Sequence, residues 1–130
     1  MYNAGNRGIA KAYKRQELLT APREKVIAYL YQGLESFVLQ SQKALDEGNI
    51  QGAGEYIGRA QGIVWELLGA LNMEEGGEIA ENLSRLYRYM INRIVEANLK
   101  KDRAPLDDVL GVLAEVKEGW NEMLAQRTSS

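Results

Sequence analysis

The chain has 130 residues, a formal net charge of −2, and neither cysteine nor histidine. This length suits one domain with a single core, and the missing cysteines exclude disulfides and thiolate metal sites. Cysteine and histidine are also the residues that most often act as nucleophile, general base or metal ligand near neutral pH. We therefore expect a protein that is not an enzyme and that holds no cofactor and no metal.

The sequence also bears on membranes and compartments. Residues 1–16 show no apolar signal-peptide core. The longest apolar run, residues 26–31, is far shorter than the roughly 20 residues that a membrane helix needs. We expect a soluble, cytoplasmic domain without membrane insertion.

Residues 1–19 are polar and are predicted to form a mobile N-terminal lead. Two interpretations remain open: a frayed terminus, or a strap whose Ile9 and Tyr13 cover an apolar groove when no partner is bound. Residues 1–25 carry six basic and two acidic side chains. These scattered cations lack the interleaved aromatic residues of a nucleic-acid track, so nucleic acid is not an expected partner.

The helical bundle is predicted to span residues 20–126, beginning with a helix over about 21–47. Thr20 is a candidate N-cap and Pro22 suits the first turn, while Gly48 is expected to end the helix in the left-handed conformation. Asn49 is expected to cap a second helix whose apolar residues repeat at spacings of three and four: Ile50, Ala53, Ile57, Ala60, Val64, Leu67 and Leu71. The short connection makes the two helices antiparallel neighbours.

Glycines form an unusual feature of the second helix, because each costs about 1 kcal/mol relative to alanine in a helix interior. On a helical wheel, four of them line a strip beside the apolar seam, with Trp65 inside the strip and Leu68 at its edge: Gly54, Gly58, Gly62 and Gly69. The strip either packs closely against a neighbouring helix or forms a trough that admits a partner's helix or backbone.

A third helix is predicted over residues 78–100, after a tight corner at Gly76-Gly77. One apolar stripe runs along it: Ile79, Leu83, Leu86, Met90, Ile94 and Ala97. Four further residues widen the stripe to an arc of about 180°: Ala80, Tyr87, Ile91 and Val95. One core contact needs an arc of only a little over 100°, so the width predicts a second apolar contact, either internal or with a partner.

The fourth helix is predicted to start near Leu106, after Pro105. Its seam includes Trp120, which we expect to close one end of the core rather than contact a partner, and residues 127–130 are expected to be a disordered tail. The predicted fold is all-α: an antiparallel up-down-up-down four-helix bundle with a short N-terminal helical or extended segment.

Several runs carry a resemblance to a known family. They are LNMEEGGEIAEN followed by LYRYM (71–90), VEANLKKD (95–102), TAPREKVIAYLYQGL (20–34) and LDDVLGVLAEVKEGW (106–120). Taken in chain order together with residues 48–72, they resemble the FliS family of flagellar export chaperones over nearly the whole chain.

The resemblance implies a cytosolic type III flagellar export chaperone. Such a protein binds the disordered C-terminal segment of flagellin, prevents its premature polymerisation and aids its export, and other flagellar export or regulatory proteins are possible further partners. Two alternatives are a chaperone of this fold for another flagellar client, and a self-associating structural bundle. Tyr13 matches the family pattern, whereas helical wheels supply the other candidate contact residues: Gly58, Trp65, Leu68, Tyr87, Ile91 and Val95.

Overall fold

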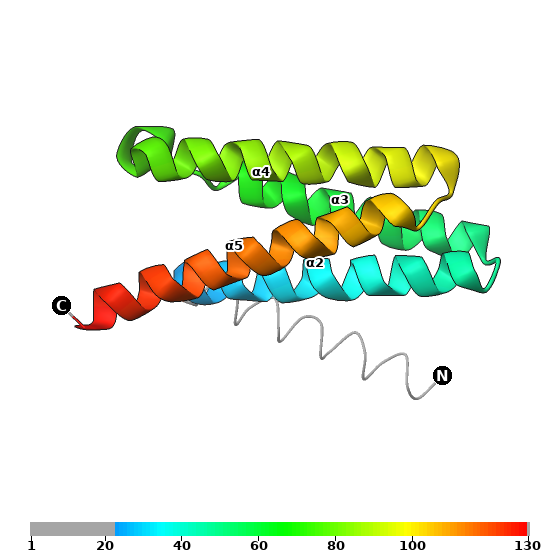
Figure 1. Ribbon diagram of the computed structural model, residues 1–130, viewed down its shortest axis with the longest axis horizontal. Helices are drawn as coiled ribbons and strands as arrows, with labels where there is room; N and C mark the ends of the chain where they lie inside the picture. The colour runs from blue at the N-terminus through cyan, green and yellow to red at the C-terminus, as the bar shows by residue number, and fades with distance from the viewer. Residues whose placement is uncertain (1–22, 130) are drawn as a thin grey trace, which may run out of the picture.

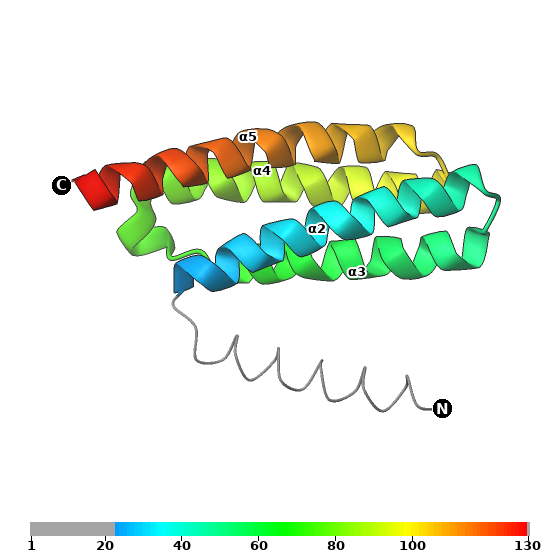
Figure 2. The same cartoon turned by 90° about the horizontal axis from the view of Figure 1, so that it is seen from below.

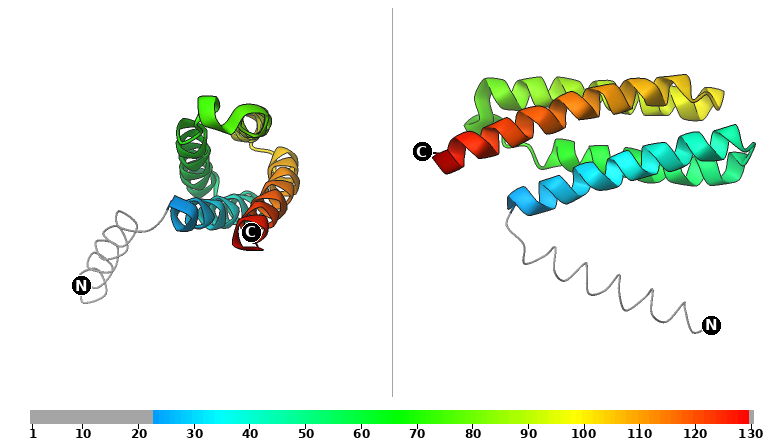
Figure 3. Two further views of the ribbon diagram at one scale, coloured as in Figure 1. Left: turned by 90° about the vertical axis from the view of Figure 1, so that its left-hand side faces the viewer. Right: turned by 60° about the horizontal axis from the view of Figure 1, so that its bottom comes forward.

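A computed structural model describes residues 23–129, with side chains as far as residue 125. This range contains four α-helices: α2 (Arg23–Asp46), α3 (Ile50–Gly69), α4 (Met73–Lys100) and α5 (Ala104–Ser129). Viewed along their axes they occupy the corners of a square, each packs on the next, and α5 closes on α2 (Figures 1, 2 and 3). The predicted antiparallel four-helix bundle is confirmed. Thr20, Pro22 and Tyr13 lie outside the described residues.

The turn between α2 and α3 forms as predicted. Gly48 has a φ of 75°, a left-handed conformation that glycine adopts without steric cost. The Asn49 side chain then accepts a hydrogen bond from the Gly52 N–H at 3.0 Å, which satisfies one of the unpaired donors at the start of α3. This connection forces α2 and α3 to run antiparallel.

The corner between α3 and α4 differs from the prediction. The Asn72 side chain accepts a hydrogen bond from the Glu75 N–H at 3.1 Å, and a helical turn that was not predicted begins at Met73. Its backbone leaves helical geometry only at Gly77, which has φ 52° and ψ −128°. Two helical segments therefore meet at a kink at Gly77, within the predicted corner, and the long segment of α4 runs from residue 78 to Lys100 as predicted.

The last helix extends beyond its predicted limits at both ends. The Asp102 carboxylate accepts a hydrogen bond from the Ala104 N–H at 3.0 Å, and α5 starts there. It continues to Ser129, so residues 127–129 are helical where a disordered tail was predicted. No glycine or proline follows Gly119 to interrupt the helix.

The core consists mainly of the predicted seams, with one exception on α3 and two on α4. Ile50, predicted to lie in the seam of the second helix, is 48% exposed at the start of α3. Ile79 was placed on the core stripe but is 63% exposed, whereas Tyr87 was placed on the sideways extension but is only 2% exposed. The kink at Gly77 changes the course of α4 just before Ile79, and Figure 1 shows α5 diverging from α4 toward this end. Ile79 therefore lacks a covering helix, while Tyr87 points into the bundle.

Candidate interaction surface

The glycine strip of α3 is open. A Cβ atom added to Gly58, Gly62 or Gly69 would meet no heavy atom of a described residue within 4 Å. At Gly54 it would meet only the Lys101 Nζ, at 3.7 Å. The glycines do not make room for a bulky side chain from a neighbouring helix, so the close-packing interpretation of the strip is wrong.

Gly54 and its neighbours Gly58 and Trp65 lie toward the edge of α3 that borders α4, whereas Gly62 and Gly69 turn further toward solvent. The proximity of Gly54 to Lys101, which follows the last residue of α4, fixes this orientation. Gly58 and Trp65 follow Gly54 at spacings of four and eleven residues, which return to nearly the same side of an α-helix. Because Trp65 is 51% exposed, a large indole surface faces solvent beside α3 backbone that no described side chain covers.

Two candidate residues of α4 lie on the edge facing this strip. The Arg93 Nε donates to the Asp108 Oδ2 at 3.1 Å, which assigns the Arg93 side of α4 to α5. Ile94 is buried, and helical geometry places Arg93 on one flank of it and Ile91 and Val95 on the other. That other flank faces α3. Ile91 is partly buried against the core, and Val95 is 37% exposed. We call Gly58, Trp65, Ile91 and Val95 the α3–α4 surface.

The other candidates lie elsewhere. Leu68 is partly buried against the core. Tyr87 lies inside the bundle, where its hydroxyl oxygen is 2.7 Å from that of Tyr31, so at this residue the wide apolar arc makes an internal contact, one of the two alternatives that the sequence left open. A tyrosine tolerates this position because its hydroxyl finds a hydrogen-bonding partner there. Tyr13 is outside the described residues.

Burial controls the ionisation of the two core tyrosines. It raises the pKa of Tyr87 far above its usual value, and the neighbouring Tyr31 raises it further. Burial also raises the pKa of Tyr31, although the hydrogen bond with Tyr87 opposes part of that change. Both hydroxyls are therefore neutral near pH 7 and form an uncharged hydrogen-bonded pair.

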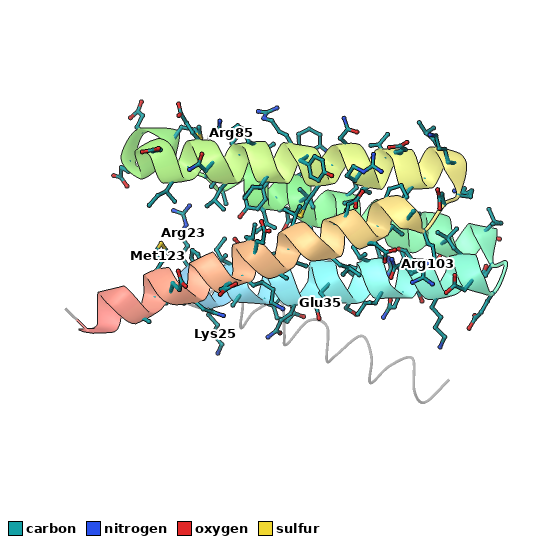
Figure 4. The ribbon with its side chains drawn as sticks, in the orientation of Figure 1. Arg23, Lys25, Glu35, Arg85, Arg103 and Met123 are labelled. Atoms are coloured by element: carbon teal, nitrogen blue, oxygen red, sulfur yellow. The ribbon has the colours of Figure 1, made fainter. Side chains whose placement is uncertain are left out.

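Sequence reasoning missed a second surface, at the end of the bundle where α5 diverges from α4. Two adjoining cavities of about 350 and 320 Å³ share four lining residues: Ile79, Leu83, Trp120 and Met123. We call them together the α4–α5 cleft; Figure 4 shows Met123 and Arg23 at this end of the molecule. Trp120 packs on the core at one end of the bundle, and it also forms a wall of the cleft.

One sequence signal for the cleft was available. Gly119 precedes Trp120 and lines the larger cavity, and a Cβ at Gly119 would meet no described heavy atom within 4 Å. A glycine beside a large aromatic residue leaves space that a longer side chain would fill. This signal marks a position on α5 but does not identify α4 as the opposite wall.

None of the helices within residues 23–129 is long and apolar enough to cross a membrane. The same part of the chain contains no cluster of three or more potential acidic metal ligands.

A rigid helical bundle with apolar residues exposed on two separate surfaces has the features of a protein-binding module. The family described as "Flagellar protein FliS" matches residues 5–127. The chain belongs to this family of flagellar secretion chaperones, as the sequence resemblance predicted.

Individual relatives agree along most of the chain. Identity to the flagellar secretion chaperone FliS of Vibrio cholerae is 38% over 121 residues, covering 90% of this chain and 89% of the relative. Identity to the flagellar secretion chaperone FliSB of Pseudomonas aeruginosa is 45% over 97 residues, covering 75% of this chain and 77% of the relative. Identity to FliS of Salmonella typhimurium is 34% over 125 residues, covering 95% of this chain and 93% of the relative.

Proposed function

We propose that this chain is a cytoplasmic chaperone that binds the disordered C-terminal segment of flagellin, prevents its premature polymerisation and delivers it for type III export. Membership of a flagellar secretion chaperone family supports a flagellar client. The observation that supports a groove for an unfolded client is the open glycine strip beside the exposed Trp65.

The glycine strip suits a client that folds as it binds. Each glycine inside α3 costs about 1 kcal/mol relative to alanine, and no side chain within the described part of the chain lies close enough to require glycine at position 58 or 62. Without Cβ atoms, this edge lets a client helix approach closely. A disordered amphipathic segment loses conformational entropy when it orders, so a rigid surface that is already formed limits the total cost of binding.

Two client contacts and one competing contact are proposed on different grounds. Trp65 supplies the aromatic anchor that dominates many interfaces, and Val95 supplies exposed apolar area on the facing helix. Tyr13, which matches the family pattern, is proposed as a contact that the N-terminal lead makes with the groove before the client displaces it.

Calorimetry with the C-terminal segment of flagellin tests the α3–α4 surface. Gly58→Leu fills the strip and Val95→Glu places a charge beside it, so each should weaken binding by about 1–3 kcal/mol, as expected for loss of a buried contact. Leu39→Glu is the matched control, because Leu39 is exposed on α2, diagonally across the bundle from α4. Circular dichroism should show unchanged helicity in all three.

The results separate the alternatives. Unchanged affinity in both test variants would place the client elsewhere on the bundle. No binding by the wild-type chain would favour another flagellar client. A concentration-dependent dimer in light scattering that the flagellin segment does not dissociate would instead favour a self-associating structural bundle.

A further inference from the structure

We propose that the α4–α5 cleft is a second docking site for the client, one that takes a short apolar stretch with a basic flank and offers it the Trp120 indole N–H as a hydrogen-bond donor. The inference rests on the proposed function, because it assigns a second contact of the same client. The cleft lies on the α5 side of α4, whereas the α3–α4 surface lies on the other side.

An unpaired donor in the cleft wall points to a missing acceptor. The Trp120 Nε1 is shielded from solvent and has no hydrogen-bond partner among the described residues. A buried donor without a partner costs about 1–3 kcal/mol, and the indole nitrogen can only donate. Trp120 borders both cavities. A carbonyl or hydroxyl oxygen of a bound peptide would therefore remove this cost after a small side-chain movement.

The lining of the cleft favours an apolar ligand. Leu83, Leu86, Val116 and Met123 line the larger cavity, and Ile79 joins them although it is largely exposed. Its volume of about 350 Å³ lies in the range of small-ligand pockets, so it holds a few side chains rather than a folded partner. Occupation by apolar side chains would cover Ile79, which no helix of the bundle does.

The rim of the cleft is acidic. Glu75, Glu115 and Glu122 line the two cavities, and none forms an ion pair with a described residue. Arg23 also lines the smaller cavity and keeps its positive charge while it donates a hydrogen bond to the Ala70 carbonyl, but the three glutamates outnumber it. The available charge is therefore negative. It favours a lysine or arginine beside the apolar residues of the client, an attraction that salt weakens.

The first arm of the experiment locates the client. The chain has two tryptophans, so Trp65→Phe leaves Trp120 as the single indole reporter. At a saturating concentration of the flagellin C-terminal segment, the emission of Trp120 should shift and its quenching by acrylamide should change. An unchanged spectrum in the saturated complex would overturn the cleft proposal.

The second arm measures affinity by calorimetry. Trp120→Phe keeps an aromatic ring but removes the donor, and should weaken binding about 3- to 10-fold. Ile79→Glu should weaken it at least 10-fold and should fold normally, because Ile79 is exposed. Removing two rim charges with Glu115→Gln and Glu122→Gln should weaken binding and flatten its salt dependence. Glu47→Gln with Glu55→Gln is the matched control, on exposed residues outside the cleft lining.

Two negative results have different meanings. Wild-type affinity in all the cleft variants would overturn the second docking site. If Gly58→Leu and Val95→Glu still weakened binding, flagellin recognition would stand. If the wild-type chain did not bind the flagellin segment at all, flagellin would not be the client. The assignment of the cleft to that client would then fail as well.

Discussion

The hydroxyl oxygens of Tyr31 and Tyr87 lie 2.7 Å apart and join α2 to α4 across the diagonal of the bundle. The Trp120 ring meets Tyr31 edge-on, with ring centroids 6.2 Å apart and an interplanar angle of 83°. Tyr31 also lines the α4–α5 cleft. The pair therefore links the centre of the core to the wall of the proposed docking site.

Removing one hydroxyl of this pair should leave the other buried without a partner. We expect Tyr87→Phe to lower the free energy of unfolding by about 1–3 kcal/mol, the cost of an unsatisfied buried polar group. Combining Tyr31→Phe with Tyr87→Phe should cost less than the sum of the single changes, since neither hydroxyl then remains. Urea unfolding measures all three; strict additivity would show that the pair is not energetically coupled.

The same pair should make the protein sensitive to alkali. Burial raises the pKa of both tyrosines above the unfolded-state value of 10.0. Above that pH the folded state retains protons that the unfolded state releases, so the free energy of unfolding should fall as pH rises beyond about 10. The double phenylalanine variant should show a shallower fall in unfolding experiments from pH 8 to 11. Equal slopes would contradict the assignment.

Gly77 should resist substitution. Its φ of 52° with ψ of −128° is a backbone conformation that favours glycine, so Gly77→Ala should lower the free energy of unfolding by about 1–3 kcal/mol. Gly62→Ala is the matched control: it lies inside α3 with open space around it and should stabilise the protein by up to about 1 kcal/mol. Thermal unfolding of both variants makes the comparison, and a stabilised Gly77→Ala would exclude backbone strain there.

Changing Gly54, Gly58 and Gly62 together to alanine should separate stability from binding. Alanine favours the helix by about 1 kcal/mol per site, and no described atom obstructs the new methyl groups. The melting temperature should rise by several degrees, while affinity for the flagellin segment should fall because the strip becomes shallower. Higher stability accompanied by tighter binding would reject the trough.

The helices and their order could be predicted because the evidence for them is local. Gly48 and Asn49 carry turn and cap signals that act within a few residues, and the seam of α3 repeats at helical spacing. The relationship between α2 and α4 is not local. A helical wheel gives the side on which Tyr87 lies but not what lies opposite, so the hydrogen bond with Tyr31 could not be foreseen.

The candidate site was predicted in part for the same reason. Periodicity placed Gly58, Trp65, Ile91 and Val95 on edges that α3 and α4 turn toward each other. It could not show that α5 departs from α4 near Ile79, because that depends on how two helices cross. The cleft therefore became visible only in three dimensions.

The ring order of the helices also has a consequence for how the chain assembles. Three of the four packed helix pairs are consecutive in the sequence. Only the contact between α2 and α5 joins the first and the last helix of the bundle. Local contacts of this kind favour folding in microseconds to milliseconds. The contact between α5 and α2 includes an ion pair of Lys117 with Glu35 and a hydrogen bond that Gln42 donates to Asp107. Because Asp107 and Lys117 belong to the last helix, the ring of helices cannot close until that helix has been synthesised.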